Sequence, residues 1–152
     1  MARKLLIMPP SYRRRIEPDL PAIERYDGVL YRVLRRNLKS DKVDILVLTE
    51  DLKLVWGNEK LPYRKPEGDR WSRYGPQDIP DNVVKKNIEF LKKVLEKGDY
   101  DEVFVALGEK FRKAIGDLEK ITNVRVTYIK GRGLGPYAQC LKEWLKKMSE
   151  HE

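Results

Sequence analysis

The sequence predicts an α/β fold, a three-layer α/β/α sandwich whose mostly parallel sheet has about four strands. Two observations support this class. Short aliphatic runs of strand length alternate along the chain with longer segments that have helical periodicity. The aliphatic runs also lack polar alternation, which is typical of strands buried on both faces and therefore of parallel sheets.

Four aliphatic segments are expected to form the strands. The first ends abruptly at Pro9-Pro10, which cannot continue a central strand. A short segment at residues 52–56 is expected to be an edge strand or the return of a hairpin. The four expected strands are residues 5–8, 43–48, 103–107 and 124–129.

Helical spacing of apolar residues predicts helices at residues 22–38, 80–97, 111–118 and 136–148. Asp27-Gly28 is expected to interrupt the first helix, with Asp27 capping its second half. Pro80 is expected to open the second helix and Gly98 to end it with a left-handed cap. Residues 57–79 have no sustained period and are predicted to be a long irregular loop within a single domain that spans residues 1–150.

The composition predicts a negatively charged partner. The chain of 152 residues has 32 Lys and Arg against 24 Asp and Glu, a net charge of +8.

With one cysteine, Cys140, and one histidine, His151, neither a structural zinc site nor a cysteine-histidine dyad is expected, and we expect no metal or cofactor. No apolar run reaches the ~18 residues of a membrane-spanning helix, so we expect a cytoplasmic protein without a membrane partner. Many charges and few amides resemble the composition of thermophile proteins.

Ligands of parallel α/β sheets bind beyond the carboxyl ends of the strands, and a glycine-rich segment lies at one of these ends. It reads Lys130-Gly131-Arg132-Gly133-Leu134-Gly135 and is expected to connect the last strand to the last helix. Glycines let backbone amides approach a phosphate, and the following helix adds a positive dipole. The alternative is a tight turn that needs positive φ, and the sequence leaves both open. The expected strand ends are residues 9–15, 49–51, 108–110 and 130–135.

Two further segments combine arginines with aromatic residues. Ser11-Tyr12-Arg13-Arg14-Arg15 follows the first strand and offers guanidinium groups to phosphates, unless it is simply a solvated loop. The long loop adds aromatic residues suited to stacking on bases, which alternatively pack against the core. Its candidate nucleic-acid contacts are Tyr63, Arg70, Trp71 and Arg73.

Carboxylates at the strand ends provide the candidate catalytic groups. Glu50 and Asp51 follow the second strand, and either is a candidate general base for chemistry on a nucleotide or nucleobase. The alternative is that these residues are helix caps or ion-pair partners.

Several short segments, spread over most of the chain, resemble the peroxide-stress, DNA-binding YaaA-like proteins and their small archaeal relatives of unassigned function. The order of Leu61-Pro62-Tyr63 and Tyr100-Asp101-Glu102-Val103 is also similar to the central domain of archaeosine synthase, which implies a fold like that of uracil-DNA glycosylase. The YaaA-like family usually carries a lysine after its second strand, where this chain has Thr49-Glu50-Asp51-Leu52-Lys53. The segments matching that family are Tyr26-Asp27-Gly28-Val29-Leu30-Tyr31-Arg32, Asp44 to Thr49, Leu61-Pro62-Tyr63, Val105 to Gly108 before Phe111-Arg112, and Gly131 to Gly135 before Trp144-Leu145.

The resemblances and the charge both imply contact with nucleic acid or a nucleobase. The sequence therefore predicts a nucleic-acid-binding protein that contacts phosphates through a basic sheet edge and the glycine-rich segment. An enzyme acting on a nucleotide or modified nucleobase is the alternative. DNA, RNA and nucleotide are not distinguished, and the oligomeric state stays open.

Overall fold

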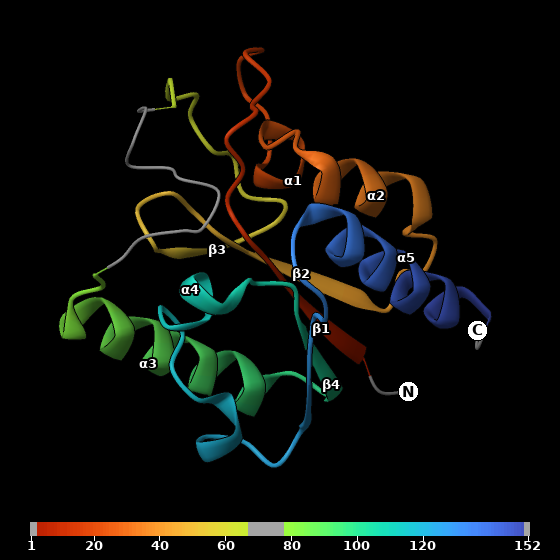
Figure 1. The fold of residues 1–152 in the computed structure, drawn as a ribbon. Helices are drawn as coiled ribbons and strands as arrows, with labels where there is room; N and C mark the ends of the chain where they lie inside the picture. The colour runs from red at the N-terminus through yellow and green to blue at the C-terminus, as the bar shows by residue number, and fades with distance from the viewer. Residues whose placement is uncertain (1–2, 67–77, 151–152) are drawn as a thin grey trace.

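A computed structural model describes residues 3–66 and 78–150, with a mostly parallel five-stranded sheet at its centre (Figure 1). The strand order is β3-β2-β1-β4-β5, in which all neighbours are parallel except β3, which is antiparallel to β2. The α/β class is confirmed, but the sheet has five strands rather than four because residues 54–56 pair with β2. The strands are β1 Arg3–Met8, β2 Val43–Leu48, β3 Leu54–Trp56, β4 Tyr100–Val105 and β5 Arg125–Tyr128.

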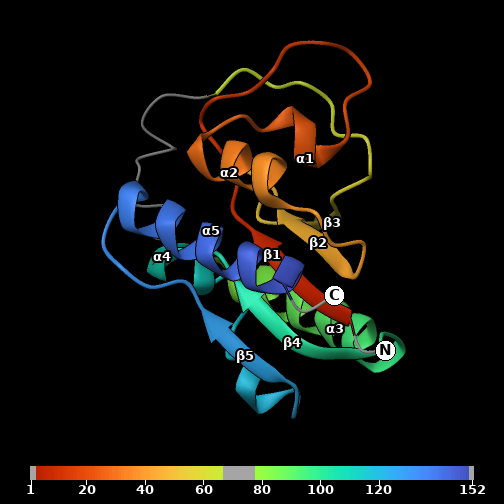
Figure 2. The ribbon, with the colours of Figure 1, turned by 90° about the vertical axis from the view of Figure 1, so that its right-hand side faces the viewer.

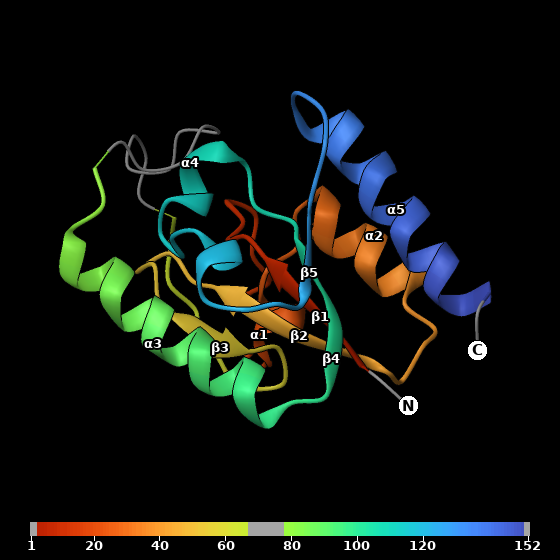
Figure 3. The same cartoon turned by 90° about the horizontal axis from the view of Figure 1, so that it is seen from below.

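Helices cover both faces of the sheet (Figures 2 and 3). On one face α1, α2 and α5 pack over Leu6 and Met8 of β1, and on the other α3, α4 and the 3-10 helix η2 pack over Leu5 and Ile7. All four side chains are fully buried, which explains why β1 shows no polar alternation. The helices are α1 Ala22–Arg25, α2 Val29–Asn37, α3 Asp81–Lys97, α4 Glu109–Arg112, η2 Leu118–Lys120 and α5 Leu134–Glu150.

Three expectations about the helix ends are wrong in detail. Gly28, not Asp27, is the N-cap of α2, and the Asp27 carboxylate binds arginines instead. Gly98 ends α3 in an extended conformation with φ of −86°, not in a left-handed one. The helix expected at 111–118 is replaced by the short α4 and η2, separated by a turn at Gly116 with φ of +68°.

The return of β3 alongside β2 depends on a short hairpin turn without glycine. The Thr49 amide donates to the Lys53 carbonyl at 2.9 Å, and the Leu52 amide donates to the Thr49 carbonyl at 2.8 Å. Leu52 takes the left-handed conformation, φ 62°, that three-residue hairpin loops require at this position. The expected edge strand and hairpin return at residues 52–56 are confirmed, although the left-handed position holds leucine rather than the usual glycine.

A buried carboxylate ties α5 and β5 to the centre of the sheet. Glu102 of β4 accepts a hydrogen bond from Thr127 Oγ1 at 2.7 Å and another from Trp144 Nε1 at 3.2 Å. Arg125 lies 3.1 Å and Lys4 3.8 Å from the same carboxylate. Glu102 lies in the first half of β4, away from the carboxyl ends of the strands, so it fixes the architecture rather than the ligand-binding edge.

The strand order also defines where the connections diverge. The four parallel strands run in the order β2-β1-β4-β5, so the chain leaves β1 toward β2 on one side and leaves β4 toward β5 on the other. Open α/β sheets bind ligands beyond the carboxyl ends of the strands at such a switch point. The loop after β1 therefore starts at the position where this architecture most often places a site.

None of the helices in the described part of the chain combines the length and the apolar character needed to cross a membrane.

Asn87 of α3 connects that helix to the β2–β3 turn, and its replacement tests this packing. Its buried amide donates to the Leu52 carbonyl at 2.9 Å and to the Ala114 carbonyl at 2.8 Å. We expect Asn87→Ala to lower the free energy of unfolding by about 2 kcal/mol or more, because both carbonyls lose their donor. Urea denaturation measures this. The control, Asn82→Ala on the exposed side of the same helix, should change stability by less than about 0.5 kcal/mol.

Candidate functional site

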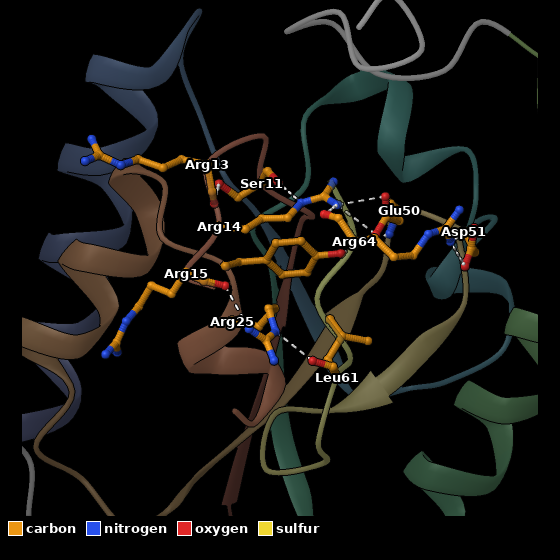
Figure 4. Close-up of polar contacts among 10 residues, drawn as sticks. Ser11, Arg13, Arg14, Arg15, Arg25, Glu50, Asp51, Leu61 and Arg64 are labelled. Atoms are coloured by element: carbon orange, nitrogen blue, oxygen red, sulfur yellow. Dashed lines mark hydrogen bonds and ion pairs between the residues drawn. The ribbon is translucent and has the colours of Figure 1, made fainter. Parts of the chain in front are cut away.

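Arg14 holds the loop after β1 to the rest of the carboxyl edge (Figure 4). Its side chain is 1% exposed, and its NH1 atom lies 2.9 Å from both carboxylate oxygens of Glu50. The same nitrogen donates to the Arg64 carbonyl at 2.7 Å, while Nε donates to the Ser11 carbonyl at 3.1 Å. The guanidinium carbon lies 5.5 Å from the centroid of the Tyr26 ring. Arg14 thereby joins the loop to the end of β2 and to the segment at residues 61–66.

Arg25 of α1 makes a second connection between the same two segments. Its Nε donates to the Leu61 carbonyl at 2.7 Å, and its NH1 donates to the carbonyls of Arg15 and Glu17 at 2.8 and 2.7 Å. Arg25 is buried, and three backbone carbonyls accept hydrogen bonds from its guanidinium in place of water. We call Arg14 and Arg25 the clamp arginines. They hold together residues 9–21 and 57–66, two segments with almost no secondary structure of their own.

Two buried tyrosines complete the anchoring of this region. The Tyr26 hydroxyl accepts a hydrogen bond from the Glu50 amide at 3.1 Å, and burial raises the pKa of Tyr26 to about 12. The Tyr31 hydroxyl donates to the Pro9 carbonyl at 2.5 Å, and burial raises its pKa well above the usual value of tyrosine. Both side chains are therefore neutral near pH 7 and act as hydrogen-bonding supports for the loop.

The loop turns Tyr12 and Arg13 outward. Tyr12 is 60% exposed, and the Arg13 side chain is 68% exposed. In Figure 4 the Arg13 side chain points away from Glu50, whereas Arg14 points toward it. Ser11 Oγ donates to the Arg13 carbonyl at 3.0 Å and packs so closely on Gly28 that a Cβ at Gly28 would collide with it. The exposed pair therefore lies directly beside the start of α2.

Asp27, at the start of α2, is surrounded by arginines. Arg32 donates to it at 3.3 Å, Arg35 also binds it, and Arg13 Nε lies 4.0 Å away. Partial burial alone would raise the pKa of Asp27, but the hydrogen bonds and charges of Arg32 and Arg35 outweigh this effect and lower it. Since a single carboxylate faces three guanidinium groups, this part of the surface keeps a positive charge.

The glycine-rich segment forms the turn into α5. Gly131 and Gly133 have φ of +119° and +87°, so the expected need for positive φ is confirmed at both. The helix begins at Leu134 rather than Pro136, which places Gly135 in its first turn. Lys130 and Arg132 are exposed and form no ion pair with the described residues. An anion-binding role for this segment stays a prediction.

The arginine segment and the glycine-rich segment lie at the same edge of the sheet. Helices α2 and α5 run side by side on one face, and both begin at the carboxyl edge (Figures 1 and 2). Arg13 lies beside the start of α2 and Arg132 just before the start of α5. Each helix start contributes unpaired backbone amides and a positive dipole to this edge. We call Tyr12, Arg13, Lys130 and Arg132 the basic edge.

The two candidate catalytic carboxylates are both held by arginines. Glu50 is 11% exposed and binds Arg14 through both oxygens. Asp51 is 59% exposed, and its oxygens accept from Arg64 NH1 at 2.9 and 2.7 Å. These contacts match the ion-pair alternative, and to act as a base Glu50 would have to give up its bonds to Arg14. A catalytic role for either residue stays a prediction that the contacts do not favour.

Tyr63 is the one candidate of the long loop whose position is described. Its ring is partly exposed, and its centroid lies 6.0 Å from the Arg25 guanidinium carbon. The other candidates of this loop, Arg70, Trp71 and Arg73, lie outside the described residues. The sequence did not identify Arg25 as an anchoring residue, because the helical spacing over residues 22–38 places it on a polar face. The expected interruption at Asp27-Gly28 was the signal that this face assignment does not apply.

Within residues 3–66 and 78–150, no group of three or more His, Cys, Asp or Glu is arranged to hold a metal ion.

Comparison with known proteins identifies a related fold but no family. The chain matches the crystal structure of AF0587, a protein of unknown function, with a TM-score of 0.61 and 18% sequence identity. The match covers 95% of this chain and 45% of that one, so the chain spans less than half the length of the protein it resembles. At this identity the likeness shows the fold alone. No family model matches the chain, and no curated protein is significantly similar to it.

The contrast between the two ion pairs after β2 gives a test of the loop anchoring. We expect Glu50→Ala to lower the free energy of unfolding by about 3–5 kcal/mol, because it leaves the Arg14 charge buried without its carboxylate. Asp51→Ala removes a solvent-exposed partner of Arg64 and should cost less than about 1 kcal/mol. Guanidinium denaturation of both variants measures the difference. Equal, small losses would show that Arg14 and Glu50 do not form a buried pair.

Proposed function

We propose that this protein is a three-layer α/β/α sandwich that binds nucleic acid through the basic edge. The proposal rests on two observations: α2 and α5 both begin at the carboxyl edge of the sheet (Figure 1), and the exposed cations Arg13, Lys130 and Arg132 lie next to these helix starts in the chain or in space. Phosphate groups are the ligands that such a combination favours, because backbone amides and guanidinium groups both donate to anionic oxygens.

The arrangement of charge supports a polyanion rather than a small acid. The net charge of +8 is far from balanced, and Lys130 and Arg132 make no ion pair with the described residues. The Asp27 cluster beside Arg13 adds further uncompensated charge along α2. Several separate cations at two helix starts are suited to a ligand that carries several phosphates along a chain.

The exposure of these residues favours a binding module over an enzyme. Tyr12, Arg13, Lys130 and Arg132 lie on the surface, and the neighbouring carboxylates Glu50 and Asp51 bind arginines. The resemblance to DNA-binding YaaA-like proteins motivates the same proposal. We place this binding activity in the cytoplasm.

The proposal is tested by comparing how oligonucleotide binding depends on salt in the wild-type protein and in a variant of the basic edge. We expect the wild-type protein to bind oligonucleotides with an affinity that falls steeply as salt rises, since each contacted phosphate releases counterions. Arg13→Ala combined with Arg132→Ala should reduce the slope of log K against log salt by about 2, one unit for each lost phosphate contact. Filter binding across a salt series measures both quantities.

A matched control removes the same charge from another surface. Lys92→Ala combined with Lys93→Ala changes two exposed cations of α3, on the opposite face of the sheet. We expect this variant to keep the wild-type slope. Equal slopes for the edge variant and the α3 variant would show that binding reflects net charge alone. An absence of binding to DNA and RNA at low salt would remove the proposed function altogether.

A further inference from the structure

We propose that the basic edge prefers single-stranded nucleic acid and that an unpaired base stacks on the ring of Tyr12. The inference rests on the nucleic-acid-binding function proposed above and specifies its substrate class. Tyr12 is 60% exposed, and its hydroxyl makes no hydrogen bond to the described residues. Tyr12 belongs to neither core cluster of the described residues, so its exposed ring is available for contact with a ligand.

The backbone on both sides of Tyr12 is held in place. The Ser11 carbonyl accepts from Arg14 Nε at 3.1 Å, and the Arg13 carbonyl accepts from the Asp27 amide at 2.9 Å and from Ser11 Oγ at 3.0 Å. The ring is therefore exposed on an ordered loop rather than on a free one. Since the loop is already fixed by buried contacts, binding a base requires less additional ordering of the backbone.

In each of the two segments of this edge, an exposed aromatic or aliphatic side chain is close in sequence to an exposed cation. Tyr12 directly precedes Arg13, and Leu134, which is 56% exposed, follows Arg132 at the start of α5. Single strands present phosphates and unstacked bases together, so they use both kinds of side chain. A duplex keeps its bases stacked inside the helix and offers mainly phosphates to such a surface. The combination at the edge therefore favours the single strand.

Fluorescence anisotropy with labelled oligothymidine, oligouridine and a DNA duplex of equal phosphate number tests this inference. We expect the wild-type protein to bind both single strands more tightly than the duplex. Tyr12→Leu should weaken single-strand binding by about 5- to 150-fold, the range found for loss of one stacked base. Tyr12→Phe, which keeps the ring, should bind the single strands like the wild type. Duplex binding and the salt slope should be the same for all three proteins.

Ile16→Ala serves as the matched control, because Ile16 is an exposed apolar residue of the same loop without an aromatic ring. It should leave single-strand binding unchanged, and thermal unfolding should show that all variants are folded. Duplex binding as tight as single-strand binding, or full single-strand affinity in Tyr12→Leu, would overturn the inference while leaving salt-dependent nucleic-acid binding intact. If none of the three probes binds at low salt, both the inference and the proposed function fail.

Discussion

The buried ion pair between Arg14 and Glu50 is the interaction on which the carboxyl edge depends. Removing two charges from water is unfavourable, and such a pair persists only where further hydrogen bonds complete it. Here the guanidinium also donates to the carbonyls of Arg64 and Ser11, and the Glu50 amide binds the Tyr26 hydroxyl. The loop after β1 has little secondary structure and therefore few backbone hydrogen bonds of its own. The side-chain hydrogen bonds of Arg14 hold it in place instead.

The arginines of this region have two different roles, one structural and one on the surface. The clamp arginines donate hydrogen bonds to backbone carbonyls and to a carboxylate inside the protein, whereas Arg13 and Arg132 are exposed on the surface. The outward position of Arg13 follows from the inward position of Arg14, since successive side chains of an extended segment point in opposite directions. A stable interior contact thus creates the surface proposed to bind nucleic acid.

The sequence predicted those features of the structure that depend on residues close together in the chain. Aliphatic runs such as Leu5–Met8 identified the strands, and Gly131 and Gly133 adopt the positive φ considered for them. The inward turn of Arg14 was not predictable, because its carboxylate partner is 36 positions away and the neighbouring arginines are chemically identical. The hairpin return at residues 52–56 was expected, but the left-handed conformation of Leu52 was not, since glycine usually occupies such a position.

Chemical-shift mapping by NMR tests most directly whether the basic edge is the binding surface. Titration of the ¹⁵N-labelled protein with oligothymidine should shift the backbone amides of Tyr12, Arg13 and residues 131–135 most strongly. The lysine-rich surface of α3, with Lys85, Lys86, Lys92 and Lys93 exposed, is the competing basic region. Its amides should change little. Shifts concentrated on α3, or an absence of shifts at the carboxyl edge, would contradict the account.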